Sequence, residues 1–198
     1  MNQELRDEEL VRQAQTGDEG AFTELVHRHE NRVYTLALKM LRQPVDAEDV
    51  LQETFISALR GLKTFRGDAS FSTWLYRIAY NATLMKLRRS SPVVSLDATL
   101  EGDESEMPRD LSDWTHDPEI VLLNQETQRA MQAAVETLSP ALRSVFVLRD
   151  LDGLSTEETA TVLAVSTQVV KTRLHRARLI LRNELADYMS TRRDRERK

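Results

Sequence analysis

Apolar residues recur at steps of three and four along most of this chain, a spacing that predicts α-helices rather than strands. We expect helices from about Asp7 to Gly17, Gly20 to Gln43, Asp46 to Leu62 and Ser72 to Arg89. The longest inner stripe belongs to the second of these, with Phe22, Leu25, Val26, His29, Val33, Leu36, Ala37, Met40 and Leu41. Only six Gly and five Pro occur in 198 residues, so few turns are available. The pattern therefore predicts an all-α protein.

Residues typical of helix ends divide the chain further. Pro44 is expected to end the second helix. Asp46, with Asp49 three residues later, is the N-cap candidate for the third, whose predicted inner face is Val50, Leu51, Thr54, Phe55, Ala58, Leu59 and Leu62. Asp117-Pro118 and Ser139-Pro140 each place an N-cap residue before a proline at the first helical position. Further helices are therefore expected to begin at both sites.

One stretch lacks the helical pattern and carries an unusual charge. Residues 91–117 contain eight Asp or Glu against a single Arg, with two prolines, which predicts an acidic flexible linker. The whole chain has 32 acidic and 27 basic residues, whereas outside this stretch 24 acidic residues stand against 26 basic ones. The predicted organisation is two small helical domains, at 1–90 and 119–198, joined by the linker at 91–118.

The second domain contains two helices separated by a three-residue break. Ser155 and Glu158 have the spacing of a capping box, which begins a helix that ends near Leu163. Ser166 can cap the next helix, whose core-facing positions are Val170, Leu174, Ala177 and Leu181. The opposite face of that helix presents polar and cationic side chains, namely Thr167, Gln168, Lys171, Thr172, His175 and Arg178.

This layout is typical of a helix-turn-helix, whose second helix places its N-terminal half in the major groove. Gln168 can pair with adenine and Lys171 with guanine, while the Arg residues at 173, 176 and 178 are better placed to neutralise phosphates. The alternative is a four-helix domain whose last helix has a solvated basic face. The two caps and the polar N-terminal half favour DNA binding.

The first domain is expected to have two unlike faces. The helix from Asp46 has an acidic outer side, explained either by the helix dipole or as a docking surface for a basic partner protein. The segment from Phe65 to Ser90 instead interleaves five aromatic residues with Arg66, Arg77, Lys86, Arg88 and Arg89. Rings that stack on bases, beside cations that meet phosphates, are typical of single-strand binding. A domain of this size also needs some of these rings in its core.

Metal, catalytic and membrane interpretations have little support. The chain has no Cys, which excludes disulfides, thiolate zinc sites and Cys nucleophiles. His27 and His29 are two residues apart and diverge on a helix, so they cannot chelate one ion. No catalytic triad, glycine-rich phosphate motif, long apolar run or signal pattern is found. We expect a cytoplasmic protein that is not an enzyme, with no cofactor and no membrane insertion.

Three motifs resemble those of the extracytoplasmic function (ECF) sigma factors, the two-domain initiation subunits of bacterial RNA polymerase. They are DAEDVLQETF at 46–55, FSTWLYRIAYN at 71–81 and the helix-turn-helix at 155–178, and the resemblance covers about residues 7–90 and 119–186. It implies binding to the polymerase core, with clamp-helix contacts through Asp46, Glu48, Asp49, Gln52, Glu53 and Phe55. Regulation by an anti-sigma factor is also expected from the family.

The resemblance further implies two contacts with promoter DNA. The −10 element would be recognised and melted by Arg66, Phe71, Ser72, Thr73, Trp74, Tyr76, Arg77, Asn81, Lys86, Arg88 and Arg89, with the loop 65–72 receiving an extruded base. The −35 duplex would be bound by Thr167, Gln168, Lys171, Thr172, His175, Arg176 and Arg178. Departures from the family pattern at Met85, Ala164 and Val169 affect the expected promoter sequence rather than the class.

Two other functions stay open at this point. A helix-turn-helix repressor would dimerise and bind DNA alone, but it leaves the acidic helix and the linker unexplained. A sigma mimic that sequesters an anti-sigma factor would not bind DNA, and the basic recognition face argues against it. The favoured prediction is a transcription initiation factor.

Overall fold

The computed structural model describes residues 5–90 and 125–196, and every regular element in these ranges is helical. The elements fall into two units, each described by itself. One holds the helices up to residue 90 together with Val147–Val170, and the other holds residues 125–146 and 171–196. The acidic segment and the predicted helix start at Asp117 lie outside the described residues.

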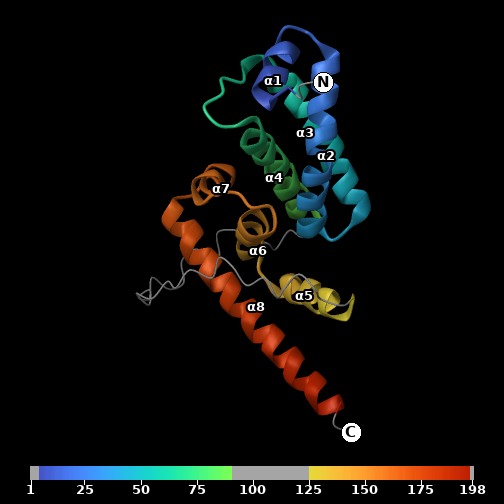
Figure 1. The fold of residues 1–198 in the computed structure, drawn as a ribbon, viewed down its shortest axis with the longest axis vertical. Helices are drawn as coiled ribbons and strands as arrows, with labels where there is room; N and C mark the ends of the chain where they lie inside the picture. Colours follow the sequence, from blue (N-terminus) through green and yellow to red (C-terminus); the bar gives the residue numbers. More distant parts are fainter. Residues whose placement is uncertain (1–4, 91–124, 197–198) are drawn as a thin grey trace. The chain divides into compact units, whose positions relative to one another are not determined.

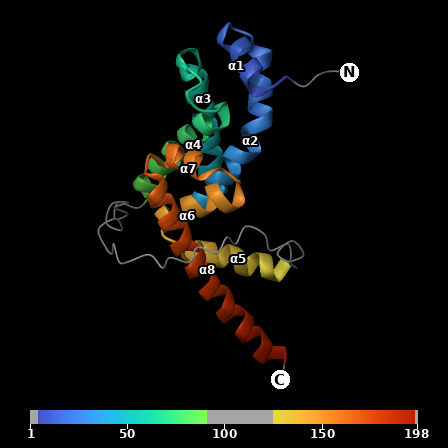
Figure 2. The same cartoon turned by 60° about the vertical axis from the view of Figure 1, so that its left-hand side comes forward.

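Four helices and one short turn make up the N-terminal part: α1 (Asp7–Gln15), α2 (Glu19–Leu41), α3 (Pro44–Gly61), η1 (Leu62–Thr64) and α4 (Phe71–Ser90). Figures 1 and 2 show α2, α3 and α4 lying against one another. Their shared core is apolar and closed to solvent, with Leu25, Leu36, Met40, Val50, Leu62, Leu75 and Ala79 all buried. This burial confirms the helical stripe expected for α2.

Local hydrogen bonds explain where these helices begin. The Asp18 carboxylate accepts from the Ala21 amide at 3.1 Å and caps α2. Before α4, the Ser70 hydroxyl accepts from the Thr73 amide at 3.1 Å. Arg42 ends α2 in the left-handed conformation, with φ 63°.

The expected N-cap of α3 is wrong. The helix begins at Pro44, with Gln43 as its N-cap residue, so Asp46 lies inside the first turn. Proline is favoured at the first helical position because its φ is already helical and its missing N–H is not needed there. Leu59 was expected on the inner face of the same helix but is 55% exposed.

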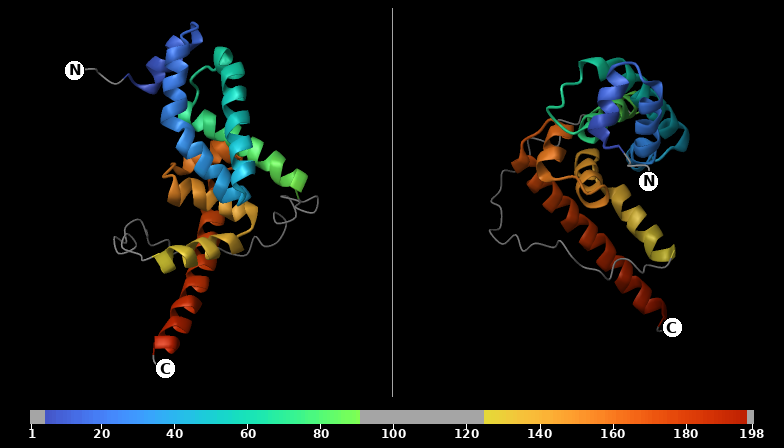
Figure 3. Two further views of the ribbon diagram at one scale, coloured as in Figure 1. Left: turned by 90° about the vertical axis from the view of Figure 1, so that its right-hand side faces the viewer. Right: turned by 45° about the horizontal axis from the view of Figure 1, so that its top comes forward.

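The remaining helices are α5 (Gln125–Thr137), α6 (Pro140–Phe146), the π-helical turn η3 (Val147–Leu151), α7 (Thr156–Leu163) and α8 (Thr167–Glu196). Figure 3 shows α8 as one continuous helix. The predicted capping box of α7 is confirmed, since Ser155 Oγ accepts from the Glu158 amide at 3.1 Å and the Glu158 carboxylate accepts from the Ser155 amide at 2.8 Å. Hydrogen bonding of the Glu158 carboxylate to the Ser155 amide, and then to the Ser155 side chain, lowers the pKa of Glu158.

The helix-turn-helix geometry also follows the prediction. Between α7 and α8, Ala164 adopts the left-handed conformation with φ 53° and ψ 44°. The four predicted core positions of α8, Val170, Leu174, Ala177 and Leu181, are all buried.

Arg143 is a charged core residue that the sequence did not single out. It is 6% exposed and donates to the carbonyls of Val135, Glu136 and Leu138 at 3.2, 3.0 and 2.7 Å. It thereby satisfies the carbonyls that the end of α5 leaves without helical partners.

Candidate functional site

The outward side of α3 presents the acidic residues that the sequence singled out. Glu48, Asp49, Gln52 and Glu53 are exposed, whereas Asp46 and Phe55 are partly buried. The core-facing positions Ala47, Val50, Thr54 and Ala58 recur at steps of three and four, and the acidic residues occupy the remaining part of the helix surface. The helix therefore holds these carboxylates toward solvent.

Three apolar side chains share that surface and were missed by the sequence reasoning. Val45, Ile56 and Leu59 are 70%, 49% and 55% exposed. The signal was present in the spacing, since each is out of phase with the buried positions of the same helix. We call the combined surface the α3 outer face, made of Val45, Glu48, Asp49, Gln52, Glu53, Ile56 and Leu59. An exposed patch that combines apolar and acidic groups is suited to a protein partner with basic residues.

The aromatic residues around the start of α4 form a connected cluster. The Phe71 ring lies 5.4 Å from His29, 6.2 Å from Phe65 and 5.8 Å from Trp74, and Phe65 lies 4.8 Å from Trp74, measured between ring centroids. Phe71 is buried, whereas Phe65 and Trp74 are partly exposed. The cluster thus has a buried base and a partly open edge.

The other predicted −10 residues divide between core and surface. Thr73 and Tyr76 are buried, and Ser72 is partly exposed. Arg66, Arg77, Asn81, Arg88 and Arg89 are exposed. We call the exposed residues of the helix itself, Arg77, Asn81, Arg88 and Arg89, the α4 basic face. Lys86 is different, because it pairs with Asp46 and Asp49 of α3.

The loop between η1 and α4 is held at its first end and is conformationally unusual in its middle. The Gln15 amide donates to the carbonyls of Leu62 and Phe65, both at 2.9 Å. Gly67 has φ 78°, a left-handed value that residues with a side chain rarely adopt. Arg66, Gly67 and Asp68 are exposed. α1 therefore fixes the base of a loop whose tip faces solvent.

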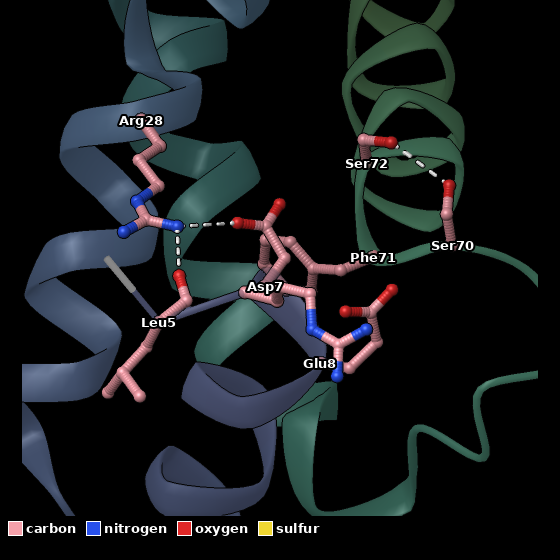
Figure 4. A pocket seen from close by; sticks show the side chains of 8 residues that line it. Leu5, Asp7, Glu8, Arg28, Ser70, Phe71 and Ser72 are labelled. Carbon is pink, nitrogen blue, oxygen red and sulfur yellow. Dashed lines mark hydrogen bonds and ion pairs between the residues drawn. The ribbon is translucent and has the colours of Figure 1, made fainter. Parts of the chain in front are cut away.

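A shallow pocket of about 470 Å³ lies where this loop joins α4 (Figure 4). Its lining comes from the chain start, α2 and the start of α4: Leu5, Arg6, Asp7, Glu8, Arg28, Ser70, Phe71 and Ser72. Arg28 donates to the Leu5 carbonyl at 2.6 Å and to Asp7 at 3.2 Å, and the second Asp7 oxygen lies 2.6 Å from His29 Nε2. Hydrogen bonding to Glu24, followed by that to Asp7, raises the pKa of Arg28. These contacts join the first turn of α1 to α2 beside Phe71.

On α8, the predicted recognition residues lie in its first half. Thr167, Gln168, Lys171 and His175 are exposed, and Thr172, Arg176 and Arg178 are partly exposed. The Ser166 hydroxyl accepts from the Val169 amide at 3.3 Å, so the N-terminal turn is capped as predicted. The arrangement fits insertion of this end of the helix into a DNA groove.

Within the described ranges, no group of three or more His, Cys, Asp or Glu side chains could hold a metal ion. None of the described helices combines the length and the hydropathy that crossing a bilayer requires.

Two family models match this chain. Sigma-70 region 2 matches residues 25–92, and Sigma-70 region 4 matches residues 128–181. The first match contains the α3 outer face and the α4 basic face, and the second contains the helix-turn-helix. Fold and matches together define the class as a sigma-70 type transcription initiation factor built from two helical domains.

The group within that class follows from two relatives. The ECF RNA polymerase sigma-E factor of Escherichia coli (strain K12) is 37% identical over 188 residues, covering 93% of this chain and 97% of the relative. The ECF RNA polymerase sigma factor SigW of Bacillus subtilis (strain 168) is 34% identical over 186 residues, covering 93% of this chain and 99% of the relative. The chain belongs to the ECF sigma factors of RNA polymerase, and the resemblance stated from its motifs is confirmed.

Solved structures agree with the fold. CnrH in complex with the cytosolic domain of CnrY matches with a TM-score of 0.66 and 29% identity, covering 91% of this chain and 97% of that chain. The sigma factor RpoE in complex with the anti-sigma factor NepR, from Bartonella quintana, matches with a TM-score of 0.62 and 21% identity, covering 83% of this chain and 96% of that chain.

Proposed function

We propose that this sigma factor binds RNA polymerase core through the α3 outer face and melts promoters with the loop and helix that follow. The observation that carries the proposal is the separation of two chemically opposite surfaces on neighbouring helices. Acidic and apolar groups are exposed on α3, whereas cations are exposed on α4. The acidic surface of α3 would repel DNA, and the cationic surface of α4 would repel basic groups of polymerase. Charge would therefore direct each partner to its own surface.

The apolar residues of the α3 outer face strengthen the assignment of the polymerase contact. Acidic groups alone are explained equally well by stabilisation of the helix dipole. That explanation gives no reason for Val45, Ile56 and Leu59 to be exposed on the same side. An interface accounts for both, because its centre is apolar while charges at its rim select the partner.

For the −10 element, we propose that the exposed and buried residues have different tasks. Arg66 and the α4 basic face would neutralise phosphates, and the open edge of Trp74 would stack against an unpaired base. Phe71, Thr73 and Tyr76 are buried and would support the loop and helix rather than contact DNA. Unstacking and extruding a base costs a few kcal/mol. Contacts with the extruded base offset that cost only where such partners are already in place.

For the −35 element, we propose that the exposed residues of the first turns of α8 contact the base edges of duplex DNA. Gln168 and Lys171 would form the base contacts, and Arg176 and Arg178 the phosphate contacts. The linker at 91–118 would join this domain to the first at 1–90.

We further propose control by an anti-sigma factor, and action in the cytoplasm where polymerase and DNA are found. The support comes from solved structures of similar fold, since RpoE from Bartonella quintana is in complex with the anti-sigma factor NepR. CnrH, at 29% identity, is in complex with the cytosolic domain of CnrY.

In vitro transcription tests the function directly. Genomic fragments are transcribed by purified bacterial core polymerase with and without this protein. We expect new start sites that appear only when the protein is added, with shared sequence elements upstream. Binding to core without any new start site would contradict promoter initiation and favour the sigma mimic.

A further inference from the structure

Lys86 lies on the side of α4 that faces α3. It follows Leu75, Ala79 and Ala82 at steps of four, three and four, and those three residues are buried. Ala82 packs in one cluster with Ala47 and Val50 of α3. Arg77 precedes Lys86 by nine residues, about 2.5 helical turns, which places the two on opposite sides of α4. Position on the helix therefore separates Lys86 from the α4 basic face.

The ammonium group of Lys86 bridges two carboxylates of α3. Its Nζ lies 3.0 Å from Asp46 Oδ1 and 2.7 Å from Asp49 Oδ2. Hydrogen bonds to Asp49, and then to Asp46, raise the pKa of Lys86, which keeps it cationic. The side chains of Asp46 and Asp49 are 29% and 58% exposed, so both stay accessible to a partner.

The bridge uses one oxygen of each carboxylate. Asp46 and Asp49 are three residues apart on a helix, so their charges are neighbours and repel each other. A cation between them removes that repulsion and fixes both side chains in one orientation. The second oxygen of each aspartate can still accept hydrogen bonds, because a carboxylate has about four acceptor positions.

We infer that Lys86 is a positioning residue for the polymerase contact, holding Asp46 and Asp49 of α3 ready for basic groups of the polymerase, and is not a DNA contact. This inference rests on the proposed function of the α3 outer face. Side chains that are already ordered lose less entropy when the partner docks. Lys86 is expected among the −10 residues from the sequence because it is a cation of the aromatic and basic segment. Its contacts with α3 become visible only in the folded structure.

The test compares Lys86→Gln with Arg88→Gln, a matched loss of one charge from the exposed side of the same turn of α4. Two quantities are measured on full-length protein: the Kd for core polymerase, and the salt dependence of promoter binding by the assembled holoenzyme. We expect Lys86→Gln to weaken core binding about fivefold, as two partly exposed ion pairs allow, with an unchanged salt slope. Arg88→Gln should reduce the salt slope by about one and leave core affinity unchanged.

Two further variants exclude a role in folding alone. Lys86→Arg keeps the charge and should restore core affinity to within about twofold of the unsubstituted protein. In a background of Asp46→Asn with Asp49→Asn, Lys86→Gln should have no additional effect on core affinity, because its partners are gone. A folding role would lower the urea midpoint in every background while the folded protein kept its core affinity, and that result would overturn the inference.

The possible outcomes distinguish failure of the positioning role of Lys86 from failure of the proposed function. If the unsubstituted protein neither bound core nor started transcription, the proposed function itself would fail. If it did both, and Lys86→Gln reduced the salt slope with normal core affinity, Lys86 would be a DNA contact and only the positioning role would be lost.

Discussion

Ala164 shows at single-residue scale how the turn between α7 and α8 departs from the favoured chemistry. Its φ of 53° is a left-handed value, which costs a residue with a Cβ about 1–2 kcal/mol. Glycine has no such penalty but loses more freedom on folding, by about 0.5–1 kcal/mol. The structure keeps the left-handed turn despite the alanine, and the flanking residues Leu163 and Val170 are buried.

We therefore expect Ala164→Gly to raise the free energy of unfolding by about 0.5 kcal/mol, the difference between those two effects. Urea unfolding followed by circular dichroism measures it. Ala133→Gly is the matched control, because Ala133 is exposed inside α5 and its replacement should cost about 1 kcal/mol. A loss of stability in both variants would show that the turn does not carry this strain.

At the scale of elements, the sequence predicted the helices well because their inner stripes are periodic and their caps are local. The capping box at Ser155 and the core positions of α8 needed only residues within a few steps of each other. Asp46 was misassigned as an N-cap because Pro44 two residues earlier was taken only as the end of α2. Local patterns define elements, and competing local signals shift their ends.

The site was only partly predictable for a related reason. The acidic positions on α3 and the cations on α4 are visible in the sequence. The pairing of Lys86 with Asp49 joins residues 37 positions apart, so it depends on how the two helices pack. The burial of Phe71 and Tyr76 likewise depends on neighbours in space, which the sequence alone does not show.

The first turns of α8 carry a prediction about DNA binding. Lys171→Ala should weaken holoenzyme binding to promoters that contain a −35 element by about 1–3 kcal/mol if it pairs with guanine. Changing the base pair that Lys171 contacts should reduce the promoter affinity of the Lys171→Ala holoenzyme little further, because that contact is already missing. A filter-binding or fluorescence titration on promoter variants measures both effects. Equal weakening on every sequence would indicate a phosphate contact instead.

At the scale of the whole molecule, the proposed function divides the work of initiation between separate surfaces. Membership of the ECF sigma factors establishes the class, and the exposed residues indicate how each partner is bound. We propose that the α3 outer face binds polymerase, that the loop and helix after it bind the −10 element, and that α8 binds the −35 element. The overall excess of acidic residues does not oppose this, since the acidic excess lies within residues 91–117.

The proposed polymerase contact is tested by the Kd for core polymerase of a protein carrying Glu48→Lys with Glu53→Lys. Both positions are exposed on the α3 outer face, and neither pairs with Lys86 among the ion pairs of the described residues. Glu19→Lys, an exposed reversal at the start of α2, is the control. We predict at least a tenfold loss of core affinity, about 1.4 kcal/mol, for the paired reversal only. Core affinity unchanged by the paired reversal, with the fold intact, would contradict the assignment of this face to polymerase.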